Sequence, residues 1–226
     1  LLVRFAEFCC LWPRFIMNSW NDDGGTTTPW MYPEALPHVR AAMELRERLM
    51  PYLYTLMWSA ARSNEPAVRP LLWEFPHDAR AAAVDDAFLL GPDLLVAPVL
   101  EEGATTRTVY LPETGSGWID YHDGRACAGG QAHQIAAPMG RLPLFVRSGA
   151  LIPVAAADGA PEFLLYGAPD EARGVLYLDD GKTMNRSGDT ASLILAKAGL
   201  RNGALWQETE VRGCACEPIR ISPFAS

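Results

Sequence analysis

The residues best suited to chemistry gather between Trp12 and Trp30. Besides these two tryptophans and Trp20, this segment holds amide, hydroxyl and carboxylate side chains: Asn18, Ser19, Asn21, Asp22, Asp23, Thr26, Thr27 and Thr28. Indole rings stack on the C–H faces of sugars, and amide and carboxylate groups hydrogen-bond to sugar hydroxyls. The segment therefore favours a carbohydrate contact. A second interpretation stays open, in which the polar side chains cap the next helix and Trp12 and Trp30 lie in the core.

The elements on either side of this segment have an α/β order. Helical spacing of apolar residues predicts one helix at about 2–11 and another at 39–64, with a kink or break at Pro51. The apolar run 14–17, bounded by a proline and the polar segment, predicts a buried strand. In α/β folds, the loop at the carboxyl end of a strand carries the ligand site. Asn18 occupies that position.

From about residue 65 the pattern changes to short β-rich runs separated by Gly, Pro and Asp. We expect strands at 68–75, 94–100, 106–111, 118–121, 144–147, 150–154, 162–165 and 175–178. This spacing is typical of an antiparallel sandwich, since the runs leave no room for the crossover helices of a parallel sheet. Residues 94–99 lack polar alternation, so we expect them to be central and covered on both faces. Clear alternation is lost over 191–226.

Composition narrows the range of partners. Of 226 residues, 49% are hydrophobic and 20% are charged, which is typical of a globular protein and excludes a disordered chain. The formal net charge of −8 disfavours nucleic acid and anionic membrane surfaces as partners. No apolar stretch is long enough to span a bilayer. The apolar pattern is already under way at Leu1, so we expect this chain to be part of a longer protein.

The five cysteines favour free thiols in a reducing, cytoplasmic compartment, although a longer parent protein could be periplasmic or secreted. Cys9 and Cys10 stand side by side in an apolar run, which predicts buried thiols. Cys214 and Cys216 lack a second ligand pair. We therefore expect no metal site and no cofactor.

Seven strings occur in a fixed order along the chain. They are Leu2-Val3-Arg4-Phe5 with Phe8 and Pro13, residues 48–56, Val68-Arg69-Pro70-Leu71, residues 88–99, Val109-Tyr110-Leu111-Pro112 with Trp118, residues 142–153, and Tyr177-Leu178-Asp179-Asp180-Gly181. Together they resemble the C-terminal half of glycoside hydrolase family 31, the α-glucosidase and α-xylosidase family. The likeness extends over residues 1–185 in unbroken order.

The resemblance implies an α/β part followed by an all-β part. The first would be the last strand-helix unit of a (β/α)8 barrel, followed by an antiparallel β-sandwich and the start of a second β-domain. We therefore expect the end of the barrel at residues 1–64, the proximal sandwich at 65–154 and a distal, possibly truncated β-domain at 155–226. Leu49, Leu53, Leu56 and Met57 would pack against the barrel and the sandwich.

The resemblance also implies a retaining α-glycosidase that acts on terminal α-linked glycosides, with carbohydrate as its partner. The family's nucleophile and acid/base are two aspartates upstream of the matched region, so we expect no catalytic residue in this chain. The residues agree with this expectation. Asp22 and Asp23 are adjacent and point to opposite sides of an extended loop, whereas a retaining pair needs two carboxyl groups about 5–5.5 Å apart across one bond.

One site position of the family falls inside the chain. The family commonly places a sugar-binding His at the end of the last barrel strand, and alignment on Pro13 places Asn18 there. Asn keeps a donor and an acceptor but carries no positive charge, which favours a branch acting on another α-glycoside. We expect Asn18 to contact substrate, with Trp20 and Asp22 as neighbours. The alternatives are a backbone-capping Asn18 and a non-catalytic carbohydrate-binding or scaffolding module.

Overall fold

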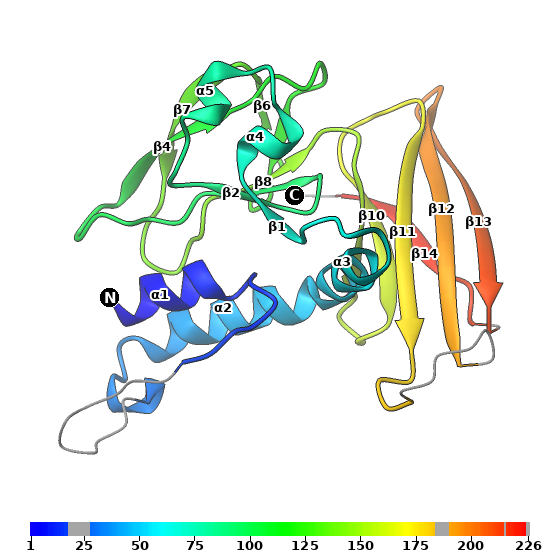
Figure 1. Cartoon of the computed structure of the whole chain (residues 1–226), viewed down its shortest axis with the longest axis horizontal. Coiled ribbons are helices and arrows are strands. Elements are labelled where there is room, and N and C mark those ends of the chain that lie inside the picture. Colours follow the sequence, from blue (N-terminus) through cyan, green and yellow to red (C-terminus); the bar gives the residue numbers. More distant parts are fainter. Residues whose placement is uncertain (18–27, 184–189, 215, 225–226) are drawn as a thin grey trace.

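Three helices dominate the N-terminal part of the chain. The computed structural model describes residues 1–17, 28–183, 190–214 and 216–224, and its helices include α1 (Leu2–Cys9), the 3-10 turn η1 (Pro29–Met31), α2 (Leu36–Arg48) and α3 (Met50–Ser63) (Figure 1). The predicted break at Pro51 is confirmed, because Pro51 lies in the first turn of α3, where a missing N–H is tolerated. Asn64 ends α3 in a left-handed conformation, with φ of 59°.

The predicted buried strand at residues 14–17 is wrong. These residues have no strand conformation, and Ile16 is 37% exposed. A strand inside a barrel satisfies its backbone by hydrogen bonds to neighbouring strands on both sides. Within the described part of the chain, no strand pairs with this segment. An apolar sequence is therefore insufficient to make this segment a strand.

The strands of the described residues form four sheets. The largest has the order β1-β2-β3-β8-β5-β6, two others are β14-β10-β9 and β11-β12-β13, and β4 pairs with β7. The bounds are β1 (Val68–Arg69), β2 (Phe88–Leu90), β3 (Leu94–Val96), β4 (Thr106–Leu111), β5 (Trp118–Asp120), β6 (Ala126–Cys127), β7 (Gln131–Ala136), β8 (Leu144–Arg147), β9 (Leu151–Ala155), β10 (Pro161–Leu165), β11 (Ala172–Asp179), β12 (Ala191–Arg201), β13 (Ala204–Gly213) and β14 (Arg220–Pro223). The strand pairs are antiparallel except β10 with β14.

Strand β3 faces a different core on each side. Leu94 and Val96 pack in a cluster with residues of α1, α2 and α3, whereas Leu95 and Ala97 pack in a second cluster with residues of β4 and β7. Alternate side chains of a strand point to opposite faces, so a strand covered on both faces must be apolar throughout. The expectation that residues 94–99 are central is confirmed, and Leu95 and Val99 are buried.

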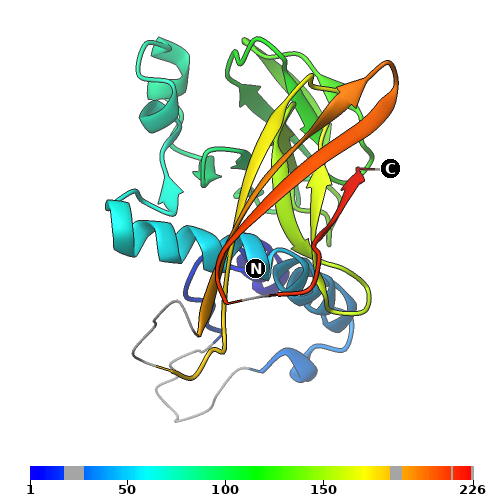
Figure 2. The same cartoon turned by 90° about the vertical axis from the view of Figure 1, so that its right-hand side faces the viewer.

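Sheet β14-β10-β9 is also covered on both faces. Ile152 and Leu164 join the core under the helices, while Phe163 and Leu165 pack with residues of the β11-β12-β13 sheet, such as Ile194. Figure 2 shows the β11-β12-β13 sheet facing the viewer, with α3 crossing behind it. Leu49, Leu53 and Leu56 lie in the core as expected, but Met57 is 42% exposed.

Several strand predictions need correction at their ends. The strand expected at residues 68–75 stops at Arg69, because Pro70 cannot continue the ladder and a short helix, α4 (Leu71–Glu74), follows. A further short helix is α5 (Ala79–Ala82). The strand expected at residues 94–100 ends at Val96, two residues before Pro98. Strands β8 and β9, on either side of Gly149, lie in different sheets.

Residues 191–213 form regular strands although their sequence lacks clear alternation. Strands β12 and β13 form a long hairpin that turns at Asn202 and Gly203, with φ values of 53° and 77°. An Asn-Gly pair is a strong hairpin signal, because both residues adopt positive φ readily. Both faces of β12 are largely apolar, which hides its period of two: Ile194 is buried, and Leu193 on the other face is partly covered.

We expect Gly91→Ala to destabilise the fold strongly. Gly91 turns the chain between β2 and β3 with φ of 61°, and a Cβ there would meet the Tyr52 hydroxyl and, at 2.7 Å, Leu56 Cδ2. Left-handed strain and overpacking add, so the free energy of unfolding should fall by about 3 kcal/mol in urea denaturation. Gly103→Ala is the matched control, since φ is 73° and no atom lies within 4 Å. Gly103→Ala should lower the free energy of unfolding by about 1 kcal/mol. Equal losses in the two variants would contradict a steric clash at residue 91.

Candidate functional site

The predicted site residues Asn18, Trp20 and Asp22 lie outside the described residues, as does the neighbouring Asp23. The structure describes the segments on either side of these residues, which are the chain from α1 to Met17 and the chain from Thr28 into η1 and α2.

Arg46 of α2 holds the chain that leads from α1 toward Asn18. One guanidinium nitrogen donates to the carbonyls of Cys10 (2.7 Å) and Trp12 (2.6 Å), and the other donates to the carbonyl of Pro13 (3.1 Å). The guanidinium carbon lies 5.8 Å from the ring centroid of Phe15. A cation at the end of α1 satisfies carbonyls that have no partner within the helix. A single side chain of α2 thereby fixes the path toward the candidate site.

The aromatic residues at the ends of the polar segment are accessible. Trp30 in η1 is 70% exposed, and Trp12 is 36% exposed while it packs against Phe8 and Phe88, with ring centroids 5.6 and 5.8 Å away. The interpretation that placed Trp30 in the core is therefore wrong, and Trp12 is only partly covered. Exposed indole faces beside a polar segment are compatible with sugar stacking.

The other acidic pairs of the sequence are engaged elsewhere. Asp86 forms an ion pair with Arg107 (2.8 Å), and the Asp179 carboxylate accepts hydrogen bonds from the hydroxyls of Tyr54 and Tyr177. Asp180 accepts a hydrogen bond from the backbone N–H of Thr183 (2.8 Å). These contacts give Asp86, Asp179 and Asp180 a structural role in turns and strand ends.

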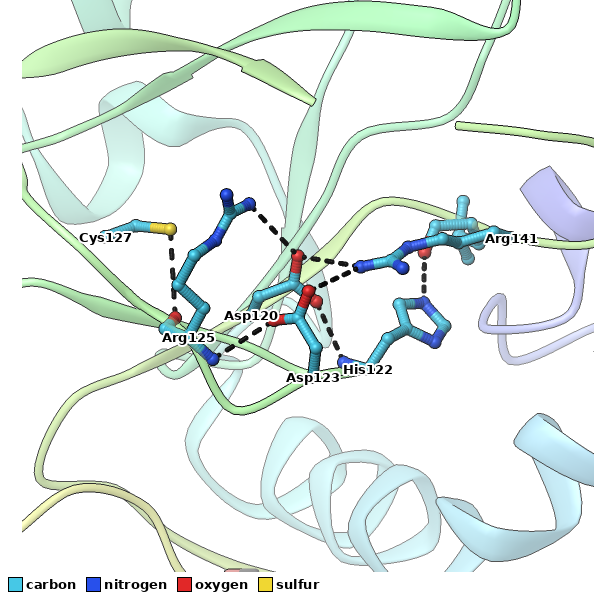
Figure 3. Close-up of polar contacts among 7 residues, drawn as sticks. Asp120, His122, Asp123, Arg125, Cys127 and Arg141 are labelled. Atoms are coloured by element: carbon cyan, nitrogen blue, oxygen red, sulfur yellow. Dashed lines mark hydrogen bonds and ion pairs between the residues drawn. The ribbon is translucent and has the colours of Figure 1, made fainter. Parts of the chain in front are cut away.

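A buried carboxylate that the sequence analysis missed is Asp120, at the end of β5. Its side chain is 2% exposed and accepts hydrogen bonds from the backbone N–H of His122 (2.9 Å) and from the Arg141 guanidinium (3.1 Å), with Arg125 at 3.9 Å (Figure 3). Buried carboxylates need such compensation. No local sequence motif predicts the contact between Asp120 and Arg141, because the two residues are distant in sequence.

Arg141 joins two carboxylates in this cluster. It also bonds to Asp123 (3.2 Å), while Nε2 of His122 lies 2.6 Å from the Leu142 carbonyl oxygen (Figure 3). Burial opposes ionisation of Asp123, but the backbone N–H of Arg125 and the Arg141 guanidinium together hold the pKa of this carboxyl below its ordinary value. Arg141 bridges both carboxylates and Arg125 lies beside Asp120, so the cluster suits a brace between two loops better than acid/base chemistry.

The thiols differ in their surroundings. Cys10 is fully buried, and burial raises the pKa of its thiol to about 12. The expectation of burial is wrong for Cys9, which is partly exposed.

Among the residues that the structure describes, no group of three or more His, Cys, Asp or Glu could hold a metal ion. No helix in the same residues has the length and apolar character needed to cross a membrane.

Comparison with known proteins identifies the class. Residues 1–56 match the TIM-barrel domain of glycosyl hydrolases family 31, and residues 64–152 match the C-terminal domain of the same family. The chain belongs to glycoside hydrolase family 31.

The relatives of this chain include several glucosidases. It is 36% identical over 194 residues to a probable glucan 1,3-alpha-glucosidase of Arabidopsis thaliana, covering 81% of this chain and 21% of that protein. It is 33% identical over 196 residues to neutral alpha-glucosidase AB of Homo sapiens, covering 82% of this chain and 21% of that protein. The chain therefore spans about a fifth of the length of these relatives.

Solved structures agree with the family. A GH31 alpha-xylosidase from Xanthomonas citri superimposes with a TM-score of 0.82 at 28% identity, covering 98% of this chain and 25% of that one. A GH31 dextranase of Flavobacterium johnsoniae, complexed with isomaltotriose, gives the same TM-score and identity, covering 99% of this chain and 29% of that one. The β-rich part that follows residue 64 is thus a family feature.

Proposed function

We propose that this chain is the C-terminal portion of a retaining α-glycosidase that hydrolyses terminal α-linked glycosides of oligosaccharides. The observation that carries the proposal is the match of residues 1–56 and 64–152 to two successive domains of one glycosidase family. The relatives include proteins named as alpha-glucosidases, and solved structures of an alpha-xylosidase and a dextranase. Carbohydrate is the substrate class that these proteins share.

The proposal divides the chain by role. Residues 1–64 form the end of the catalytic barrel, residues 65–154 a proximal β-sandwich, and residues 155–226 the start of a distal β-domain. The core on the β4–β7 side of β3 is built from residues between 71 and 145 and supports a proximal unit. The core on the other face is shared with α1, α2 and α3, and β9 pairs with β10 across the second boundary.

Within this division, the chain supplies a substrate contact and not the catalytic pair. Asn18 would bond sugar hydroxyls, with Trp20 and Asp22 beside it, and Arg46 would fix the direction of the chain that carries Asn18. The engagement of Asp86, Asp120 and Asp179 with cations or tyrosine hydroxyls supports a catalytic pair outside this chain. Retaining hydrolysis then proceeds through a glycosyl-enzyme intermediate on a carboxylate from the preceding barrel strands.

The test is the stereochemistry of hydrolysis by the full-length protein that contains this chain. We expect release of the α-anomer first, followed by mutarotation, in proton NMR spectra of a para-nitrophenyl α-glycoside reaction, because two displacements retain configuration. A carbohydrate-binding module would bind the same glycoside and leave it intact. Binding without turnover, or first release of the β-anomer, would overturn the proposal.

A further inference from the structure

A groove of about 500 Å³ runs between α3 and the β11-β12-β13 sheet. Tyr54, Trp58 and Arg62 of α3 line one side, while Tyr177 of β11, Leu193 of β12 and Arg212 of β13 line the other. In Figure 1 the β11-β12-β13 sheet, which forms one wall of the groove, lies at the opposite end of α2 and α3 from residues 29–31. The groove is therefore separate from the flanks of the candidate substrate segment, and its volume is within the range of ligand sites.

The aromatic side chains of the groove are held in place by contacts that need no ligand. The rings of Trp58 and Tyr177 are stacked, with centroids 5.1 Å apart and planes 15° apart, and the Tyr54 ring lies 6.0 Å from that of Tyr177. The hydroxyls of Tyr54 and Tyr177 donate to the same Asp179 carboxylate at 2.9 and 3.0 Å. A platform fixed in advance loses little entropy when a ligand binds.

Two guanidinium groups border this platform. Arg62 lies with its guanidinium carbon 5.8 Å from the Trp58 ring centroid, and within residues 1–17, 28–183, 190–214 and 216–224 it forms no ion pair. Arg212 pairs with Glu210 at 2.7 Å, but both side chains are about 60% exposed, so this pair is weak and easily rearranged. Guanidinium N–H groups are donors without acceptor capacity, and they suit sugar hydroxyl oxygens.

We propose that this groove is a second, non-catalytic binding site for an α-glucan chain. Tyr177 is 5% exposed and supports the platform from below, so sugar C–H faces would pack on the partly exposed rings of Trp58 and Tyr54. Sugar hydroxyls would accept hydrogen bonds from Arg62 and Arg212. The proposal rests on the proposed function for its ligand class. Its consequence is that a polysaccharide is held by the α3–β11 groove while another part of it occupies the active site.

Affinity electrophoresis of the 226-residue chain through gels containing soluble starch or dextran tests this site. The wild-type chain should be retarded. Trp58→Ala should weaken retardation at least tenfold, measured as the apparent Kd from polysaccharide titration. Trp73→Ala is the matched control, because Trp73 on α4 is 52% exposed and does not line the groove. It should migrate as wild type.

Trp58→Ala removes the stack on Tyr177, so a second variant separates binding from folding. Ala61→Gln inserts a longer side chain into the groove from an exposed helical position, and it leaves that stack intact. It should weaken retardation at least fivefold with an unchanged circular dichroism spectrum. Wild-type retardation of Ala61→Gln, or an unretarded wild-type chain, would overturn the groove proposal.

The two proposals fail separately. Asn18→Ala should keep the retardation of wild type, since Asn18 belongs to the other site. Loss of retardation in Asn18→Ala together with its retention in Trp58→Ala would overturn the groove proposal and support the loop site. Hydrolysis by the full-length protein is measured independently, so an inactive enzyme with a functional groove would overturn only the proposed catalytic function.

Discussion

The purified 226-residue chain should release no para-nitrophenol from aryl α-glycosides, whereas the full-length protein should do so readily. The proposed function places both catalytic aspartates outside this chain. Loss of nucleophile and acid/base removes the covalent route and the protonation of the leaving group, a difference of about 10⁶-fold or more in rate. A colorimetric assay at high protein concentration measures it.

A folded chain is the required control for that result. Near-ultraviolet circular dichroism should show ordered aromatic side chains, given the buried Trp118 and the stacked Trp58 and Tyr177. Turnover by protein purified free of host glycosidase would contradict the prediction. It would place the catalytic pair within residues 1–226 and direct attention to the segment with Asp22 and Asp23.

In the full-length protein, Asn18→Ala should lower kcat/KM tenfold or more, with little change in stability. A site built to bond a sugar hydroxyl is left with an unpaired polar group when one partner is removed, and tenfold corresponds to about 1.4 kcal/mol of transition-state stabilisation. Steady-state kinetics on α-glycosides and thermal unfolding measure the two quantities. Asn21→Ala provides a matched loss of an amide from the same segment, and its kinetics should stay close to wild type.

Asn18→His examines the departure from the family pattern. Gain of activity on α-glucosides, with loss on the preferred substrate, would identify this position as a determinant of specificity. A contrary outcome is equally informative: unchanged kinetics of Asn18→Ala with a melting temperature several degrees lower would mean that Asn18 caps the backbone. The assignment of Asn18 as a substrate contact would then be abandoned.

Local physics made part of this fold predictable from the residues alone. The break at Pro51, the end of α3 at Asn64 and the turn at Gly91 each follow from backbone geometry that one residue type imposes. The two-sided apolar run at residues 94–99 required burial on both faces, and β3 has it. The segments around Pro51 and Gly91 and the run 94–99 also carry the family resemblance, since their apolar residues form the core.

Tertiary structure alone decided the rest. The apolar run at residues 14–17 is not a strand, because strand formation depends on partners that neighbouring residues cannot supply. Arg46 contacts carbonyls more than thirty residues away, Arg141 neutralises Asp120, and the groove joins Trp58 to Tyr177. Sequence determined which groups exist and which faces are apolar. Which of these groups make contact is decided by the packing of segments that are distant in sequence. Such contacts stabilise the fold only after the loops between those segments have closed.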